Sequence, residues 1–311
     1  MLTVYRNMFR IRDLRNKILF TLLIFLIYRL GTAIPVPGVD LDAVKEFADQ
    51  GEAAGIMGLL NLFSGGALEA FSVFTLGIMP YITSSIIMQL LAVVIPRLQK
   101  MQEEGESGRK VITQWTRYVT VLLALLQSTG LTYLFHRGTL TNGIDLIPDY
   151  SAGRVLLIVL TLTAGTAFSM WLGELITQRG VGNGMSLIIF VSIVSQMPSS
   201  FLQVQRSTSM LKFSIVMLMF LLMTAGIIFV DQGQRRIPIQ FSKRVRGRRV
   251  LGGQSTYIPL KVNTAGVIPI IFASSMLYLP AMFVTAIPSS GFWGSIRNWI
   301  NNNLANARSR W

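Results

Sequence analysis

Seven long apolar stretches constrain this chain more than any other feature. They lie near residues 18–34, 75–95, 111–135, 154–176, 185–205, 211–230 and 264–287, and Pro198 makes the fifth the weakest. Each approaches or exceeds the length that a helix needs to cross about 30 Å of hydrocarbon. Only 14% of the residues are charged, whereas a soluble domain would carry about 25%. The chain is therefore predicted to be an all-α polytopic membrane protein.

The basic residues are unevenly shared between alternate connecting segments. Of the 28 Lys and Arg residues, 19 lie in 1–17, in 97–117, at Arg179 and in 232–262. Eight lie in the intervening segments, and Arg29 lies within the first apolar stretch. Cytoplasmic loops of membrane proteins carry the excess of basic residues. The N-terminus is therefore predicted to be cytoplasmic, and the chain as given to end outside after seven spans.

Two short motifs, 189 residues apart, repeat Gly, Pro and Ile at the same offsets. One reads GIMPYI at 77–82 and the other reads GVIPII at 266–271. Each opens an apolar stretch and is soon followed by a Ser-Ser pair, at 84–85 and at 274–275. The repeat predicts an internally duplicated membrane protein, in which interrupted helices of corresponding halves tend to line the substrate path.

The segment 55–74, GIMGLLNLFSGGALEAFSVF, is apolar but too short to cross the membrane and return. Gly65 and Gly66 interrupt it, and Glu69 would be costly against lipid. Irregular backbone at membrane depth is tolerated where it is buried in protein or lines a cavity. Two interpretations stay open: a re-entrant plug, or an interfacial helix that rests on the outer surface.

The segment 232–262 is predicted to form a short cytoplasmic hairpin. Ile237 and Ile239 alternate with polar residues, Arg246 and Gly247 could make a turn, and apolar residues at 250–251 begin a return strand. The basic residues at its tip are Lys243, Arg244, Arg246, Arg248 and Arg249. They satisfy the positive-inside rule, but eight basic residues in this loop exceed what orientation requires. RNA, an acidic protein surface or anionic lipid headgroups are the candidate partners.

Motifs for chemistry are missing from the sequence. GxxxxGK[ST], HExxH and GxSxG are absent, there is no cysteine, and His136 is the one histidine. The glycine-rich run at 180–184 follows a lipid-length helix instead of a strand, so it is no dinucleotide loop. Arg29 and Glu174 lie towards span ends, where they are expected to snorkel to the interface. No cofactor or metal is expected, and a passive conduit is favoured over a pump or an intramembrane hydrolase.

Five runs of sequence carry a specific resemblance. They are FSGGALEAFSVFTLGIMPYITSSIIMQLL (63–91), EGESGRK (104–110), MWLGELITQRGVGNGMSLIIF (170–190), GQRRIPIQ (233–240) and VNTAGVIPIIFASS (262–275). These runs resemble the SecY family, the channel subunits of the bacterial Sec protein translocase. The similarity covers nearly the whole chain from Leu14 to about Pro288. It implies a SecY-like inverted-repeat helical bundle of two halves with a re-entrant plug.

The resemblance also implies roles for particular residues. A hydrophobic pore ring would comprise Ile78, Ile82, Met185, Ile189 and Ile271, where Met185 departs from the common isoleucine. The plug would cover about 61–72, including Asn61, Phe63, Ser64, Gly65, Gly66, Leu68 and Glu69. A lateral gate for signal sequences would use Gln89, Gln127, Ser274 and Ser275. The basic hairpin would dock the ribosome or SecA, with Arg248 and Arg249 matching the family's most characteristic pair.

The family has ten spans, and seven are expected here, so the fold is predicted to be C-terminally incomplete. The expected parts are a cytoplasmic N-terminus (1–17), a first half with spans one to five (18–205), the start of a second half (211–287) and an external tail (288–311).

The expected function is a protein-conducting channel in the bacterial cytoplasmic membrane, driven by the ribosome or SecA. Its expected partners are SecE and SecG, SecA, the ribosome with its ribosomal RNA, the nascent chain with its signal sequence, and membrane lipids. A secondary transporter of small solutes is the alternative, and it would need a charged or densely polar site at the midplane. An intramembrane enzyme would need a catalytic dyad.

Overall fold

A computed structural model defines the architecture. It describes residues 11–49, 61, 63–138, 143, 145–239, 244–246, 249–251, 256–263 and 266. The chain divides into two units, one comprising 1–198 and 272–311 and the other comprising 199–271. The seventh expected span, 264–287, and the expected tail, 288–311, lie almost wholly outside the described residues.

Helices dominate the described residues. They are α2 (Arg12–Ala33), α3 (Leu41–Asp49), α5 (Met79–Val94), α6 (Pro96–Glu103), α7 (Glu106–His136), α8 (Ala152–Arg179), α9 (Gly184–Ser207) and α10 (Met210–Gln232). Five of them, α2 and α7 to α10, are long and apolar enough to cross a membrane. They cover the first, third, fourth, fifth and sixth expected spans, and α9 continues through Pro198.

The second expected span, 75–95, differs from its prediction. Its helix α5 begins only at Met79 and has 16 residues, about 24 Å of rise against about 30 Å of hydrocarbon. The chain before it runs in turns, because Gly77 adopts a φ of 52° and Pro80 falls at the helix start. Pro96 then opens α6, which bends away from α5 by 103°.

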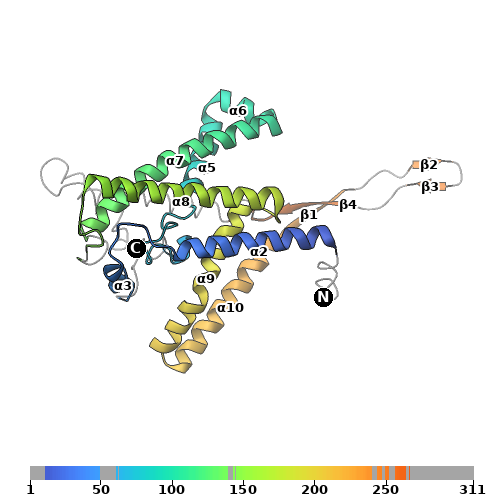
Figure 1. Ribbon diagram of the computed structural model, residues 1–311. Helices are drawn as coiled ribbons and strands as arrows, with labels where there is room; N and C mark the ends of the chain where they lie inside the picture. Colours follow the sequence, from blue (N-terminus) through green and yellow to red (C-terminus); the bar gives the residue numbers. More distant parts are fainter. Residues whose placement is uncertain are drawn as a thin grey trace, which may run out of the picture. The chain divides into compact units, whose positions relative to one another are not determined.

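In the first unit α7 is the central helix. It packs against α5 on one side and α8 on the other, and α2 packs against α8 (Figure 1). Polar groups fasten the α5–α7 contact: the Ser84 hydroxyl donates to the Thr116 carbonyl at 2.6 Å and accepts from Thr120 at 2.9 Å. All three side chains are buried. Such paired hydroxyls satisfy each other where no water is available.

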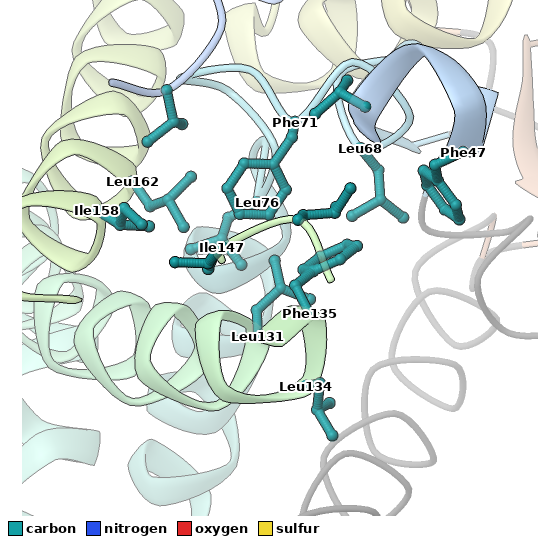
Figure 2. Close-up of a cluster of buried hydrophobic side chains, with 13 residues drawn as sticks. Phe47, Leu68, Phe71, Leu76, Leu131, Leu134, Phe135, Ile147, Ile158 and Leu162 are labelled. Carbon is teal, nitrogen blue, oxygen red and sulfur yellow. The ribbon is translucent and has the colours of Figure 1, made fainter. Parts of the chain in front are cut away.

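A hydrophobic cluster, which we call the Phe71 cluster, joins the turn segment before α5 to α3, α7 and α8 (Figure 2). The rings of Phe71 and Phe135 of α7 contact edge to face, with their centroids 4.7 Å apart. Phe47 of α3 contacts the Phe135 ring in the same way, at 6.1 Å. Leu68 and Leu162 are also fully buried. Burying a side chain of this size contributes about 1.5–3 kcal/mol, so the cluster anchors the turn segment firmly.

The second unit holds the end of α9, α10 and a β-ribbon. Phe201 and Phe220 contact edge to face at 5.6 Å, which packs α9 against α10. The ribbon comprises β1 (Gln234–Ile239), β2 (Arg244–Arg246), β3 (Arg249–Leu251) and β4 (Thr256–Lys261). β1 pairs antiparallel with β4, and β2 with β3. The predicted hairpin is therefore confirmed.

Candidate functional site

Four of the five expected ring residues are described, and three of them share one hydrophobic cluster. Ile78 and Met185 are buried in this Ile78 cluster, and Ile82 packs against its edge. Ile189 is half-buried and not part of it. Ile271 lies outside the described residues. The remaining buried members are Ile24, Tyr28, Ala67, Phe74, Met170, Leu172, Ile176 and Ile188.

Close contact between α8 and α9 positions Met185. A Cβ on Gly184 would collide with the Gly173 carbonyl, and a Cβ on Gly173 would collide with the Met185 thioether. The Asn183 side chain accepts from the Met185 amide at 3.1 Å and so caps the start of α9. The two glycines thus let α9 approach until Met185 reaches the same cluster as Ile78.

The segment 61–72, which we call the plug segment, is buried inside the first unit. Ser64 is 2% exposed, Leu68 is 1% exposed and Ala67 is fully buried within the Ile78 cluster. Glu69 is half-buried, and its amide donates to the Asn61 side chain at 3.4 Å. Because an interfacial helix would leave one face outside the protein, this burial favours the plug interpretation.

Polar side chains from two helices reach the plug segment. Arg29 of α2 donates to the Gly65 carbonyl at 2.8 Å, and Gln196 of α9 donates to the Asn61 carbonyl at 3.2 Å. The contact of Gln196 with the plug segment is not predicted from the sequence. A polar residue on a predicted span was the available signal, but nothing in the sequence says which segment it faces.

Arg29 and Glu174, which are expected to snorkel, both have partners within the protein. Arg29 bonds the plug segment, and Glu174 of α8 pairs with Arg117 of α7 through two contacts of 2.7 Å. The Glu174 side chain is 17% exposed and that of Arg117 44%. A charged group inside an apolar span marks an interaction worth seeking, and that signal applied to both residues.

The expected gate residues lie in different surroundings. Gln89 is exposed on α5 and donates to the Ser85 hydroxyl at 3.4 Å. Gln127 is 3% exposed on α7, and its carbonyl oxygen has no hydrogen-bond partner among the described residues. The pair at 274–275 lies outside the described residues. The described part of the chain therefore contains only Gln89 and Gln127 of the expected gate.

The ribbon comprises two antiparallel ladders. In one of them Arg244 pairs with Leu251 and Arg246 pairs with Arg249, so the chain reverses direction between Arg246 and Arg249. Directly paired residues occupy one face of a β-ribbon, so the positions of Arg244, Arg246 and Arg249 fall on the same face. Lys243 and Arg248 lie outside the described residues.

The arrangement brings apolar side chains of α5, α8 and α9 together with Ala67 of the plug segment. Within the described ranges, no three His, Cys, Asp or Glu side chains come together as metal ligands would.

Sequence comparison finds close relatives along nearly the whole chain. Residues 72–307 match the sequence profile of SecY. The protein translocase subunit SecY of Streptomyces scabiei is 52% identical over 314 residues, which cover 98% of this chain and 71% of the relative. The subunit of Mycobacterium tuberculosis strain H37Rv is 50% identical over 301 residues, covering 95% of this chain and 68% of the relative.

Solved channel structures share the fold. A structure of a protein-conducting channel superposes with a TM-score of 0.57 at 16% identity, covering 86% of this chain and 58% of that chain. Sec61 in the canine ribosome–channel complex from the endoplasmic reticulum gives the same values. This chain thus spans 58% of the length of either solved channel.

Proposed function

The chain belongs to the SecY family, and we propose that it acts as a protein-conducting channel subunit. It moves secretory polypeptides across the cytoplasmic membrane of a bacterium and releases membrane proteins into the bilayer. One geometric observation carries the proposal: Ala67 of the plug segment is buried in the same cluster as Ile78 and Met185. A closed conduit requires this contact between an apolar constriction and a segment that fills it.

The ring residues account for sealing without chemistry. An apolar constriction excludes water and ions when it is empty, because no polar group there replaces their hydration. Met185 fits this role because a flexible thioether adapts to whatever passes. Passage of a polypeptide requires the plug segment to leave and the ring side chains to part, and the chain catalyses no reaction.

Partners supply the energy and the direction. The sequence lacks a nucleotide-binding motif, so the ribosome or SecA provides the driving force and docks on the basic end of the ribbon. A tip with Arg244, Arg246 and Arg249 suits polyanionic ribosomal RNA through phosphate contacts and counterion release.

SecE and SecG are the companion subunits, the N-terminus is cytoplasmic, and Gln89 and Gln127 belong to the lateral gate. The ribosome-bound Sec61 and yeast Ssh1 channels, which share this fold, support the ribosome as a partner.

Site-specific photo-cross-linking tests the proposal. A photoreactive residue is placed at Ile82 or Ile189 of the full-length protein, assembled with its companion subunits in proteoliposomes, and a secretory chain is arrested in transit. We expect adducts from both positions and none from Leu156, which is 62% exposed on α8. Absence of adducts at all three positions, with uptake of small solutes instead, would support the transporter alternative. The family relationship gives that alternative no support.

A further inference from the structure

Two side-chain donors hold the N-terminal part of the plug segment by its main chain. The Arg29 guanidinium donates to the Gly65 carbonyl at 2.8 Å, and the Gln196 amide donates to the Asn61 carbonyl at 3.2 Å. We propose that Arg29 and Gln196 form a latch, two positioning residues that keep the plug segment seated and set how readily the closed channel opens. This inference rests on the proposed function.

The latch is mounted on helices that are tied to each other independently of the plug segment. The Tyr28 hydroxyl of α2 and the Ser192 hydroxyl of α9 are 3.0 Å apart. Arg29 also donates to the Ser195 hydroxyl at 3.3 Å, and that hydroxyl donates to the Ser192 carbonyl at 2.8 Å. The donors therefore remain in place when the plug segment leaves, ready to bind it again.

Two glycines let the plug segment reach the latch. Gly65 and Gly66 have φ angles of +71° and +87°, which residues with a side chain rarely adopt. A Cβ on Gly65 would lie 3.2 Å from the Ser192 Cα, and a Cβ on Gly66 would lie 3.0 Å from the Gln196 amide nitrogen. The glycine pair thus places both carbonyls within reach of side chains that a bulkier backbone would push away.

The latch is built to release. Arg29 is exposed and Gln196 is half-buried, so each donor can exchange its contact for another partner outside the protein core. No charge is left buried and unpaired, which is the main penalty for breaking a buried polar contact. The C-terminal part of the plug segment, with Leu68 and Phe71 fully buried, offers no such exchange.

The accessibility of a single cysteine measures the latch directly. The sequence has no cysteine, so Ser64→Cys introduces one thiol at a position that is 2% exposed. The rate at which an impermeant maleimide modifies it from the external face is measured in the resting, fully assembled channel. The free energy lost with a hydrogen bond from a charged donor is partly recovered through other partners. We therefore expect Arg29→Gln to raise the rate of maleimide modification roughly 3- to 10-fold. Gln196→Ala should raise it roughly 2- to 5-fold.

Matched variants keep the test decisive. Arg15→Gln makes the same change at an exposed position of α2 and should leave the rate unchanged. Arg29→Lys retains a charged donor and should fall between the parent and Arg29→Gln. If Arg29→Gln proves unstable, Arg29→Lys and Gln196→Ala carry the test. Rates for the Arg29 and Gln196 variants that equal those of the parent and Arg15→Gln would overturn the latch.

The readout separates the latch from the proposed function, because it needs no moving polypeptide. If the latch variants are modified faster but the channel never passes a polypeptide, the latch stands and the proposed function is overturned. If modification is unchanged but the channel passes polypeptides normally, the latch is overturned and the proposed function stands.

Discussion

The two parts of the plug segment are held by opposite kinds of interaction. Residues 61–66 contact α2 and α9 through hydrogen bonds to main-chain oxygens. Residues 67–72 are held chiefly by apolar side chains, with Leu68 and Phe71 in the Phe71 cluster and Ala67 in the Ile78 cluster, and the Phe71 carbonyl also accepts from the Val36 amide at 3.0 Å. Hydrogen bonds can be exchanged with water at little net cost, whereas apolar burial is lost in full.

The difference assigns different tasks to the two parts. The polar part can leave its seat, with Ala67 drawn out of the Ile78 cluster, while Phe71 stays attached to α7 and α8. A segment anchored at one end returns to the same place, which a channel that closes repeatedly requires.

The largest expected effect comes from the anchored part. Phe71→Ala removes a fully buried ring that contacts Phe135 and should lower the free energy of unfolding by about 3–5 kcal/mol. Unfolding in detergent at increasing denaturant measures it. Leu122→Ala, at a position of α7 that is 58% exposed, serves as the control and should change little. Equal loss in both variants would contradict an anchor at Phe71.

The ion pair between Arg117 and Glu174 tests whether the loss of any charged contact loosens residues 61–66 of the plug segment. Glu174→Gln breaks the pair with Arg117 and should cost about 1–2 kcal/mol, since that pair is partly exposed. Maleimide modification at Ser64→Cys should nevertheless stay at the parent rate, because the pair joins α7 to α8. Exchanging the two residues, by Arg117→Glu with Glu174→Arg, should restore the free energy of unfolding. An increase in modification as large as that of Arg29→Gln would mean that the polar part responds to general loosening.

Glycine substitution separates backbone strain from displacement of the latch. Gly66→Ala and Gly182→Ala both place a Cβ at positive φ, at a cost of about 1 kcal/mol. Only the Cβ at position 66 would meet Gln196, and nothing lies within 4 Å of the one at 182. Both variants should lose similar stability, but only Gly66→Ala should speed modification of Ser64→Cys. Faster modification in both would attribute the effect to strain.

The smallest effect on either part is expected from the ribbon. Arg248→Glu with Arg249→Glu should change the free energy of unfolding by less than about 0.5 kcal/mol and leave modification at Ser64→Cys unchanged. Binding to ribosomes or SecA should weaken, with a shallower salt dependence. Binding that stays the same across a salt titration would reduce the basic tip to a topology signal.

The helices and the hairpin could be predicted from the sequence, because lipid length and alternation are local properties. The membrane-length helices overlap the expected spans, and the ribbon reverses where Arg246 and Gly247 predicted a turn. The short α5 is an exception. Hydropathy predicts a span over 75–95, but Gly77 at positive φ and Pro80 at the helix start delay the helix to Met79.

The contacts of the candidate site could be predicted only in part. Resemblance brought Ile78, Ile82 and Met185 together as ring residues, and the structure places them in one cluster. Arg29 and Gln196 donate to main-chain carbonyls, so the residues that accept these hydrogen bonds need no particular side chain. A carbonyl is common to every residue, so no sequence pattern pairs Gln196 with a segment 135 residues away.

A reversible lock on the plug segment tests the central claim most directly. Cysteines at Asn61 and Gln196 can be joined by a cleavable cross-linker in a protein that otherwise has none. Adducts are then measured between an arrested secretory chain and a photoreactive residue at Ile82. The account predicts that adducts are lost when the lock is closed and return when it is cleaved. Equal adducts in both states would contradict it, because the polypeptide would then pass without moving the plug segment.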